Sequence, residues 1–191
     1  SIKALAYQLY ENNGVLQRNQ VTDYLKILGQ NERKFLRDQG VKFGRYHVFL
    51  HKLIKPEAVS LRTLLWKNYH QKYFNLKPPV FGLNFLENDK IKNRNFMLLC
   101  GFEKFDNFYV RIDILERLFV QIINSNTEKN EIKLIPEMLN LLGCNKDNFK
   151  KLLKIMGYKV FKKNHDIFFK YNPRKGSKKV SKKFIKESPF K

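Results

Sequence analysis

Apolar residues recur every three or four positions in four stretches of the first 72 residues, a spacing that predicts amphipathic helices. The predicted helices cover residues 2–12, 19–28, 31–39 and 56–71. Asn19 and Asn31 stand where an N-cap is needed for the second and third, and Pro56 suits the first turn of the fourth. Residues 41–55 are apolar but irregular, and Gly44 interrupts them. The pattern predicts a helical module over residues 1–72.

Helical spacing is absent between residues 73 and 95. Pro78–Pro79 and Gly82 interrupt this stretch, and a run of Asn, Asp and Lys follows them. Such composition is typical of a surface crossing. We therefore expect residues 73–95 to be a linker.

A second module is predicted over residues 96–172. Residues 101–105 and 108–112 favour a hairpin around Asp106–Asn107, and residues 113–124 a helix that Asp113 and Glu116 could start as a capping box. The later elements are a short extended piece, two helices joined by a tight turn, and two strands: 131–135, 136–142, 147–156 (capped by Asn145 or Asp147), 158–163 and 166–171. This order is that of a winged helix-turn-helix. The predicted fold class is mainly α (α+β), with a helical module followed by a winged-helix-like module.

Charge changes this picture more than any other property. The chain has 38 Lys and Arg against 17 Asp and Glu, a net charge of +21, and residues 146–191 alone hold 16 basic and 3 acidic residues. So large an excess is most simply explained by a polyanionic partner. Residues 173–191 lack apolar periodicity and are expected to form a flexible basic tail.

Catalytic motifs are absent from the sequence. It has no G-x-x-x-x-G-K-[ST] phosphate loop and no carboxylate pair after a buried strand, so no site for a nucleotide and magnesium is predicted. His47 and His51 are four residues apart but lack the neighbouring Glu of a zinc protease, and Cys100 and Cys144 are interpreted as reduced core thiols. No run of 18 apolar residues could span a bilayer, so no membrane association is expected.

Binding residues are predicted mainly on the last helix and the hairpin after it. Phe149, Leu152, Leu153 and Met156 follow the spacing of a core face, which turns the lysines of the same helix toward solvent. With the hairpin and the tail they would form a phosphate-binding surface: Lys150, Lys151, Lys154, Lys159, Lys162, Lys163, Arg174 and Lys175. A merely solvated charged face is the alternative. Because none of the predicted helix or hairpin cations is arginine, contact without sequence preference is favoured over base recognition.

A second candidate is Phe43-Gly44-Arg45-Tyr46-His47, where aromatic rings and a base alternate around a glycine. Arg45 could bind a phosphate while the rings stack on unpaired bases. The alternative reading is that these rings fill the core of the helical module.

Four segments carry a family resemblance: SIKALAYQLYENNGVLQR, GVKFGRYHVFLHKLIKPEAVSLRTLLW, FYVRIDILERL and IPEMLNLLGCNKDNFKKLLKIMGYK. Together they resemble the C-terminal region of bacterial superfamily 2 DExH-type helicases related to the mitochondrial degradosome RNA helicase. The resemblance covers residues 1–170, departs where His51 replaces an expected proline, and implies two upstream RecA-like ATPase lobes that use ATP and Mg²⁺. No catalytic residue, cofactor or metal is expected in this segment.

We therefore expect a cytoplasmic, non-catalytic accessory region of an ATP-dependent RNA helicase that contacts nucleic acid, RNA above all, through phosphates. A ribonuclease is a further candidate partner. Two other interpretations remain open, a DNA-binding winged-helix regulator and an adaptor whose helical module docks another protein.

Overall fold

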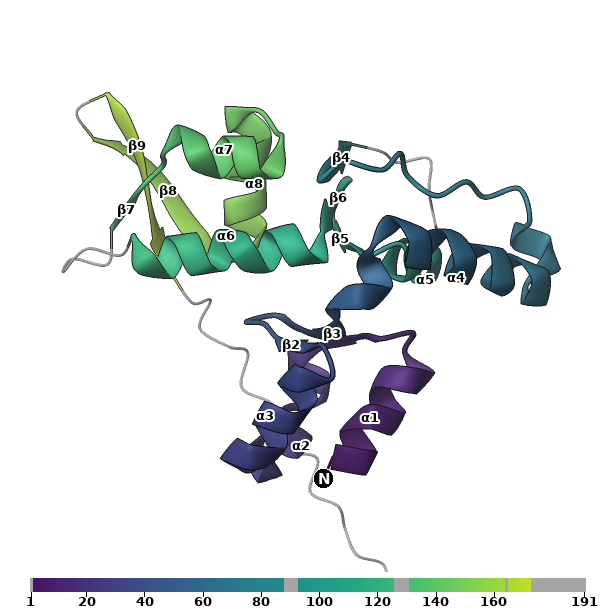
Figure 1. The fold of residues 1–191 in the computed structure, drawn as a ribbon. Coiled ribbons are helices and arrows are strands. Elements are labelled where there is room, and N and C mark those ends of the chain that lie inside the picture. The colour runs from purple at the N-terminus through teal and green to yellow at the C-terminus, as the bar shows by residue number, and fades with distance from the viewer. Residues whose placement is uncertain (1, 88–92, 126–130, 164, 173–191) are drawn as a thin grey trace, which may run out of the picture.

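The computed structural model describes residues 2–87, 93–125, 131–163 and 165–172. Within these ranges the chain is a mixed α/β protein with three small antiparallel sheets (Figure 1). The predicted basic tail, residues 173–191, lies outside them. Among the described helices, none combines the length and the apolar character that crossing a membrane requires.

The first segment contains three α-helices, one short 3-10 helix and one sheet. Leu5, Leu9, Leu25 and Leu36 of the helices are buried against Leu16, Val41 and Val48 of the strands. The sheet is antiparallel, in the order β1-β3-β2. The elements are α1 (Ile2–Glu11), β1 (Val15–Gln17), the 3-10 helix η1 (Arg18–Gln20), α2 (Thr22–Ile27), α3 (Gln30–Asp38), β2 (Val41–Phe43) and β3 (His47–Leu50).

This segment is not purely helical, contrary to the expectation for residues 1–72. The irregular stretch after residue 40 forms the β2–β3 hairpin, whose strands of three and four residues are too short for alternation to stand out. The expected caps Asn19 and Asn31 are also wrong, because Val21 precedes α2 and Gly29 precedes α3. His51 donates its backbone N–H to the Gly40 carbonyl at 3.2 Å, a bond that proline could not make.

The middle segment holds the second sheet, in the order β4-β6-β5. The hairpin predicted around Asp106 is confirmed, with Asp106 at φ 46°. The predicted linker is more than a crossing, since its residues Phe85–Glu87 pair with Phe108–Val110. The elements are η2 (His51–Ile54), α4 (Pro56–Tyr69), η3 (Gln71–Tyr73), β4 (Phe85–Glu87), α5 (Arg94–Leu99), β5 (Phe102–Phe105) and β6 (Phe108–Arg111).

The third segment contains the elements predicted for it. Asn145 caps α8 by accepting the Asn148 N–H at 2.8 Å, and Gly143 ends α7 in the left-handed conformation. Phe149, Leu152, Leu153 and Phe169 are fully buried in its core. The sheet order is β7-β9-β8, and the elements are α6 (Ile112–Asn124), β7 (Ile132–Lys133), α7 (Pro136–Leu142), α8 (Lys146–Ile155), β8 (Tyr158–Lys163) and β9 (Asp166–Tyr171).

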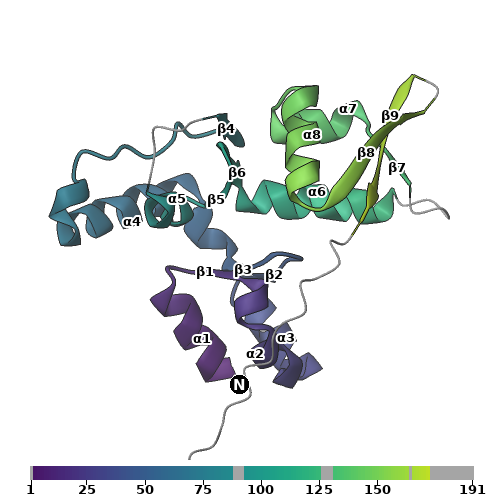
Figure 2. The same ribbon diagram turned by 180° about the vertical axis from the view of Figure 1, so that it is seen from behind.

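The three segments share one topology that the sequence did not suggest. In each sheet the strand that comes last in the chain lies in the centre, between the other two. The first and third segments both run helix, strand, helix, helix, strand, strand, whereas the described part of the middle segment has one helix fewer between its first two strands. The last strand of one segment leads to the first helix of the next, through η2 into α4 and directly from β6 into α6. The β2–β3 hairpin lies below α6 in both ribbon views (Figures 1 and 2).

Candidate nucleic-acid interface

The helix α8 presents lysines to solvent as the sequence predicts. Phe149, Leu152 and Leu153 are fully buried, and Lys151 and Lys154 are exposed on the opposite side. Lys150 is half-buried, and its Nζ lies 2.9 Å from Asp147 Oδ1. Lys151 and Lys154 therefore retain charge for a ligand, while that of Lys150 is partly neutralised within the helix.

The lysines of the β8–β9 hairpin do not form one face. Residues alternate along β8, so Lys159 and Lys163 lie on the outer face, whereas Lys162 lies on the face of the core residues Tyr158 and Val160. Lys163 Nζ is also 3.4 Å from Glu131 Oε2. The sequence predicted that the hairpin lysines would lie on one surface, but the hairpin places them on two faces. Arg174 and Lys175 lie outside the described residues.

Arg45 belongs to a different surface, the turn between β2 and β3. Its guanidinium lies 5.9 Å from the ring centres of both Tyr46 and Tyr171. Tyr171 is the last residue of β9, so Arg45 brings the first segment against the third. The two aromatic rings hold this exposed guanidinium in place, and Tyr46 also accepts a hydrogen bond from it, which leaves its other N–H groups for a ligand.

Arg45 lines a cleft of about 1150 Å³ between the β2–β3 hairpin and α6. Phe43 and Phe119 contribute to its apolar lining, with the exposed side chains of Val120 and Ile123. Its basic lining residues, which define the arginine cleft, are Arg18, Arg37, Lys42, Arg45, Lys55, Arg111 and Arg117. Lysine outnumbers arginine in the chain by 29 to 9, yet five of the nine arginines line this one cleft.

Two of these cations are engaged within the protein. Arg111 forms two 2.7 Å hydrogen bonds with Asp113, and Arg18 donates to the Gly44 carbonyl. Burial would raise the pKa of Asp113, but Arg111 outweighs that effect and lowers it. Within the described ranges the other five cleft cations are exposed and form no ion pair with a carboxylate: Arg37, Lys42, Arg45, Lys55 and Arg117.

Glu116 of α6 holds the turn that carries Arg45. Its carboxylate accepts backbone N–H bonds from Arg45, Tyr46 and His47 at 2.5, 3.0 and 2.9 Å. A Cβ on Gly44 would lie 2.3 Å from Glu116 Cδ, so only glycine permits this approach. The expected capping box is therefore wrong: the carboxylate that should close the first turn of its own helix caps a distant hairpin, and Arg111 precedes α6 without a side-chain cap.

His47 lies between two carboxylates, and the three residues are each less than 10% exposed. Its Nδ1 is 3.2 Å from Glu116 Oε1 and its Nε2 is 3.0 Å from Glu103 Oε2. Glu103 also accepts from Arg94 Nη2 at 3.0 Å. Because β3, α5, β5 and α6 supply its members, this His47 cluster (His47, Arg94, Glu103 and Glu116) connects all three segments and fixes one wall of the arginine cleft against the other.

The protonation of this cluster follows from its contacts. Burial alone would lower the pKa of His47, but hydrogen bonds to Glu103 and Glu116 raise it above its usual value. Burial would raise the pKa of Glu103, yet His47 and Arg94 lower it to about 2. Only the imidazolium can donate to both carboxylates, so folding favours the positively charged form of His47.

The stability of the protein should therefore depend on pH through His47. A raised pKa in the folded state contributes stability that is complete below the unfolded pKa of about 6.5 and disappears as the pH rises through the folded pKa. Glu103 has the opposite pH dependence, because its contribution to the stability of the folded protein is lost as the pH falls from about 4.5 toward 2. Urea unfolding at a series of pH values would measure the free energy of unfolding of the native chain and of His47→Gln. The difference between the two free energies should decrease as the pH rises above 6.5. A difference independent of pH would contradict the charged assignment.

The residues described here include no group of three or more His, Cys, Asp and Glu side chains placed to hold a metal ion. His51 contributes to the arginine cleft, apart from the buried His47. Cys100 is buried, which raises the pKa of its thiol to about 12 and keeps it protonated.

The sequence pointed to the Phe43–Tyr46 part of the arginine cleft but not to its other basic residues. They come from positions between Arg18 and Tyr171 and meet only when the three segments pack. One signal in the sequence could have indicated these residues: arginines are few in this lysine-rich chain, so each one is a candidate for a specific role. In comparisons with protein-family models, curated proteins and solved structures, the chain matches none of them.

Proposed function

We propose that this chain is a non-catalytic nucleic-acid-binding region that contacts the phosphate backbone of RNA in the arginine cleft. One observation carries the proposal: five of nine arginines line a single cleft, and the five cleft cations named above as unpaired are exposed there. Arginine binds phosphate oxygens through two parallel hydrogen bonds, which lysine cannot match.

The chemistry of the cleft favours a nucleic acid over a small anion. Its two acidic lining residues, Asp113 and Glu116, are occupied by Arg111 and by the hairpin backbone. Its volume of about 1150 Å³ exceeds what one phosphate fills, and the apolar side chains of Val120 and Ile123 offer contacts to sugars and bases. Lys151 and Lys154 of α8 would extend the contact beyond the cleft.

The topology supports a winged-helix interpretation of the first and third segments. Each has two consecutive helices before its hairpin, and the central position of the last strand is the arrangement that a three-stranded wing sheet requires. Under this interpretation α8 is the recognition helix. Its exposed cations are lysines, which favours backbone contact over reading of base edges.

The larger context rests on the resemblance noted in the sequence. The region would act in the cytoplasm beside two RecA-like lobes, which would supply ATP and Mg²⁺ chemistry, and would hold RNA as those lobes move. A second role, protein docking, is favoured by the exposed apolar face of α4, where Leu61, Leu64 and Leu65 are each more than half exposed. That face could receive the lobes themselves or a ribonuclease partner.

Binding should weaken steeply with salt if phosphates dominate. Neutralising about five phosphates of a single strand gives a slope near −3.5 in log K against log salt, or about a 500-fold loss of affinity between 50 and 300 mM. Fluorescence anisotropy with a labelled 20-nucleotide RNA would measure it. Equal affinity at both salt concentrations would rule out the phosphate mechanism, and a marked preference for one duplex DNA sequence would favour a DNA-binding regulator instead.

A further inference from the structure

The outer face of the third sheet carries an aromatic pair that the core does not explain. Phe161 of β8 is directly opposite Phe168 of β9, and their rings stack with centres 6.1 Å apart and planes 18° from parallel. The neighbouring Phe169 points to the other face, where it is fully buried against Phe149 and Tyr158. Phe161 and Phe168 are only partly buried and do not pack against that core.

Lysines flank the two rings at one end. Lys159 is directly opposite Lys170, and both are exposed. Like charges on facing positions of two strands destabilise a hairpin. In the part of the chain that the structure describes, neither lysine has a carboxylate partner, so this repulsion is uncompensated.

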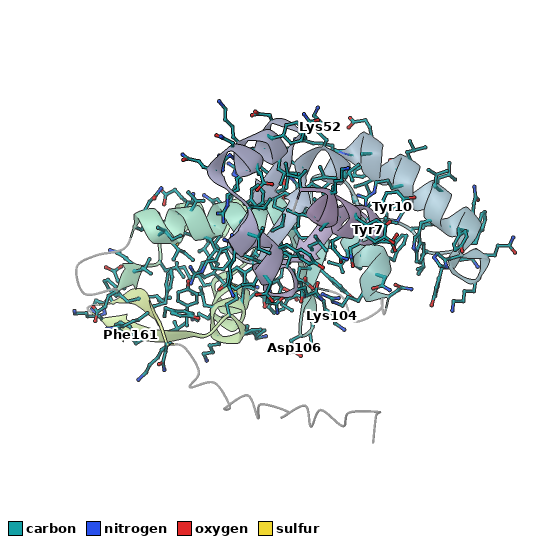
Figure 3. The ribbon with its side chains drawn as sticks, turned by 90° about the horizontal axis from the view of Figure 1, so that it is seen from below. Tyr7, Tyr10, Lys52, Lys104, Asp106 and Phe161 are labelled. Carbon is teal, nitrogen blue, oxygen red and sulfur yellow. The ribbon has the colours of Figure 1, made fainter. Side chains whose placement is uncertain are left out.

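The opposite end of the same face is neutralised. Lys133 lies 2.5 Å from Asp166, and Lys163 pairs with Glu131. Among the described residues of this face, the unpaired positive charge therefore lies at the Lys159–Lys170 end, immediately beside the rings. Figure 3 shows Phe161 at the margin of the molecule, far from Tyr7 and Tyr10 of α1.

We propose that this face is a second nucleic-acid site, which takes unpaired bases of a single strand. A base stacks against the partly exposed rings of Phe161 and Phe168, and the adjoining phosphates lie between Lys159 and Lys170, whose repulsion they relieve. Bases within a duplex are already stacked and cannot reach the rings, so the site discriminates single strands from duplexes. The inference takes its ligand class from the proposed function, but its residues are separate from the arginine cleft.

The test uses single-stranded RNA that contains 2-aminopurine, whose fluorescence is quenched when it stacks. Phe161→Leu with Phe168→Leu keeps apolar side chains on the strands but removes the rings. This variant should lose the quenching and bind single-stranded RNA about tenfold more weakly, as expected for one stacked base. Its affinity for duplex RNA should stay unchanged.

A second variant tests the site without changing the phenylalanines, whose replacement could also alter the structure. Lys159→Gln with Lys170→Gln should reduce the salt slope for single-stranded RNA by about 1.4, at 0.7 per phosphate contact, while thermal unfolding shows no loss of stability. If the phenylalanine variant keeps both quenching and affinity, or weakens duplex binding equally, the stacking site is wrong. If the native chain binds no RNA at all, the proposed function itself is wrong. If the native chain binds RNA and both double variants bind it equally well, only this inference is wrong.

Discussion

Replacement of Arg45 and Arg117 by glutamine should weaken binding of single-stranded RNA by about 150-fold or more at 100 mM salt. A hydrogen bond to a charged group contributes about 1.5 kcal/mol or more, and the two losses together give a factor of this order. Arg45 projects from the β2–β3 turn and Arg117 from α6, so the pair removes one free cation from each wall of the arginine cleft. The negative slope of log K against log salt should also become less steep by about 1.4.

The matched control is Lys3→Gln with Lys34→Gln. These two exposed lysines on α1 and α3 lie outside the cleft, and their removal lowers the net charge by the same two units. Anisotropy titrations of both double variants should show a loss of less than about threefold for the control, since charges remote from the strand act only through the screened overall field. Comparable losses in the two variants would mean that overall charge, rather than the cleft, binds the RNA.

Glu116→Ala should cause the largest loss of stability, about 3–5 kcal/mol, because it leaves a buried charge and several buried donors without an acceptor. Three backbone N–H groups and His47 Nδ1 all lie within hydrogen-bond distance of this carboxylate. A loss of this size should lower the melting temperature by about 10 °C in a chain of this length. Calorimetry together with urea unfolding would measure it.

Glu137→Ala provides the comparison, since Glu137 is an exposed glutamate in the first turn of α7. Its removal should cost less than about 0.5–1 kcal/mol. Glu116→Gln should lie between the two, because the amide retains one oxygen acceptor but loses the negative charge that faces His47. A melting temperature for Glu116→Ala close to that of Glu137→Ala would show that the hairpin does not depend on this carboxylate.

Local signals predicted the third segment well. Pro136 and Gly143 bracket α7 and Asn145 caps α8, and each of these signals depends on residues within four positions. The same holds in the middle segment, where Asp106 adopts the left-handed conformation in the turn of its hairpin. Lys151 and Lys154 of α8 face solvent as predicted, since the burial of Phe149, Leu152 and Leu153 fixes the opposite face, whereas Lys150 is half-buried beside Asp147.

The first sheet and strand β4 of the second were missed because their information is not local. Strands β1, β2 and β4 have three residues each, which leaves at most two positions on either face to show alternation. β4 becomes a strand by pairing with β6, more than twenty residues later. Glu116 shows the same conflict: its spacing from Asp113 satisfies the rule for a capping box, but the tertiary fold uses its carboxylate for a hairpin 69 to 71 residues earlier.

The direct succession of Arg111 in β6 and Ile112 in α6 has a mechanical consequence. No loop residue separates strand from helix, and Arg111 is further clamped to Asp113 on the first turn. The middle sheet and α6 should therefore move as one rigid unit, because their junction has no loop residue that could act as a hinge. If an RNA strand were pulled through the arginine cleft, the force would act on α6 and on the β2–β3 turn together and would be transmitted through α6 to the middle sheet.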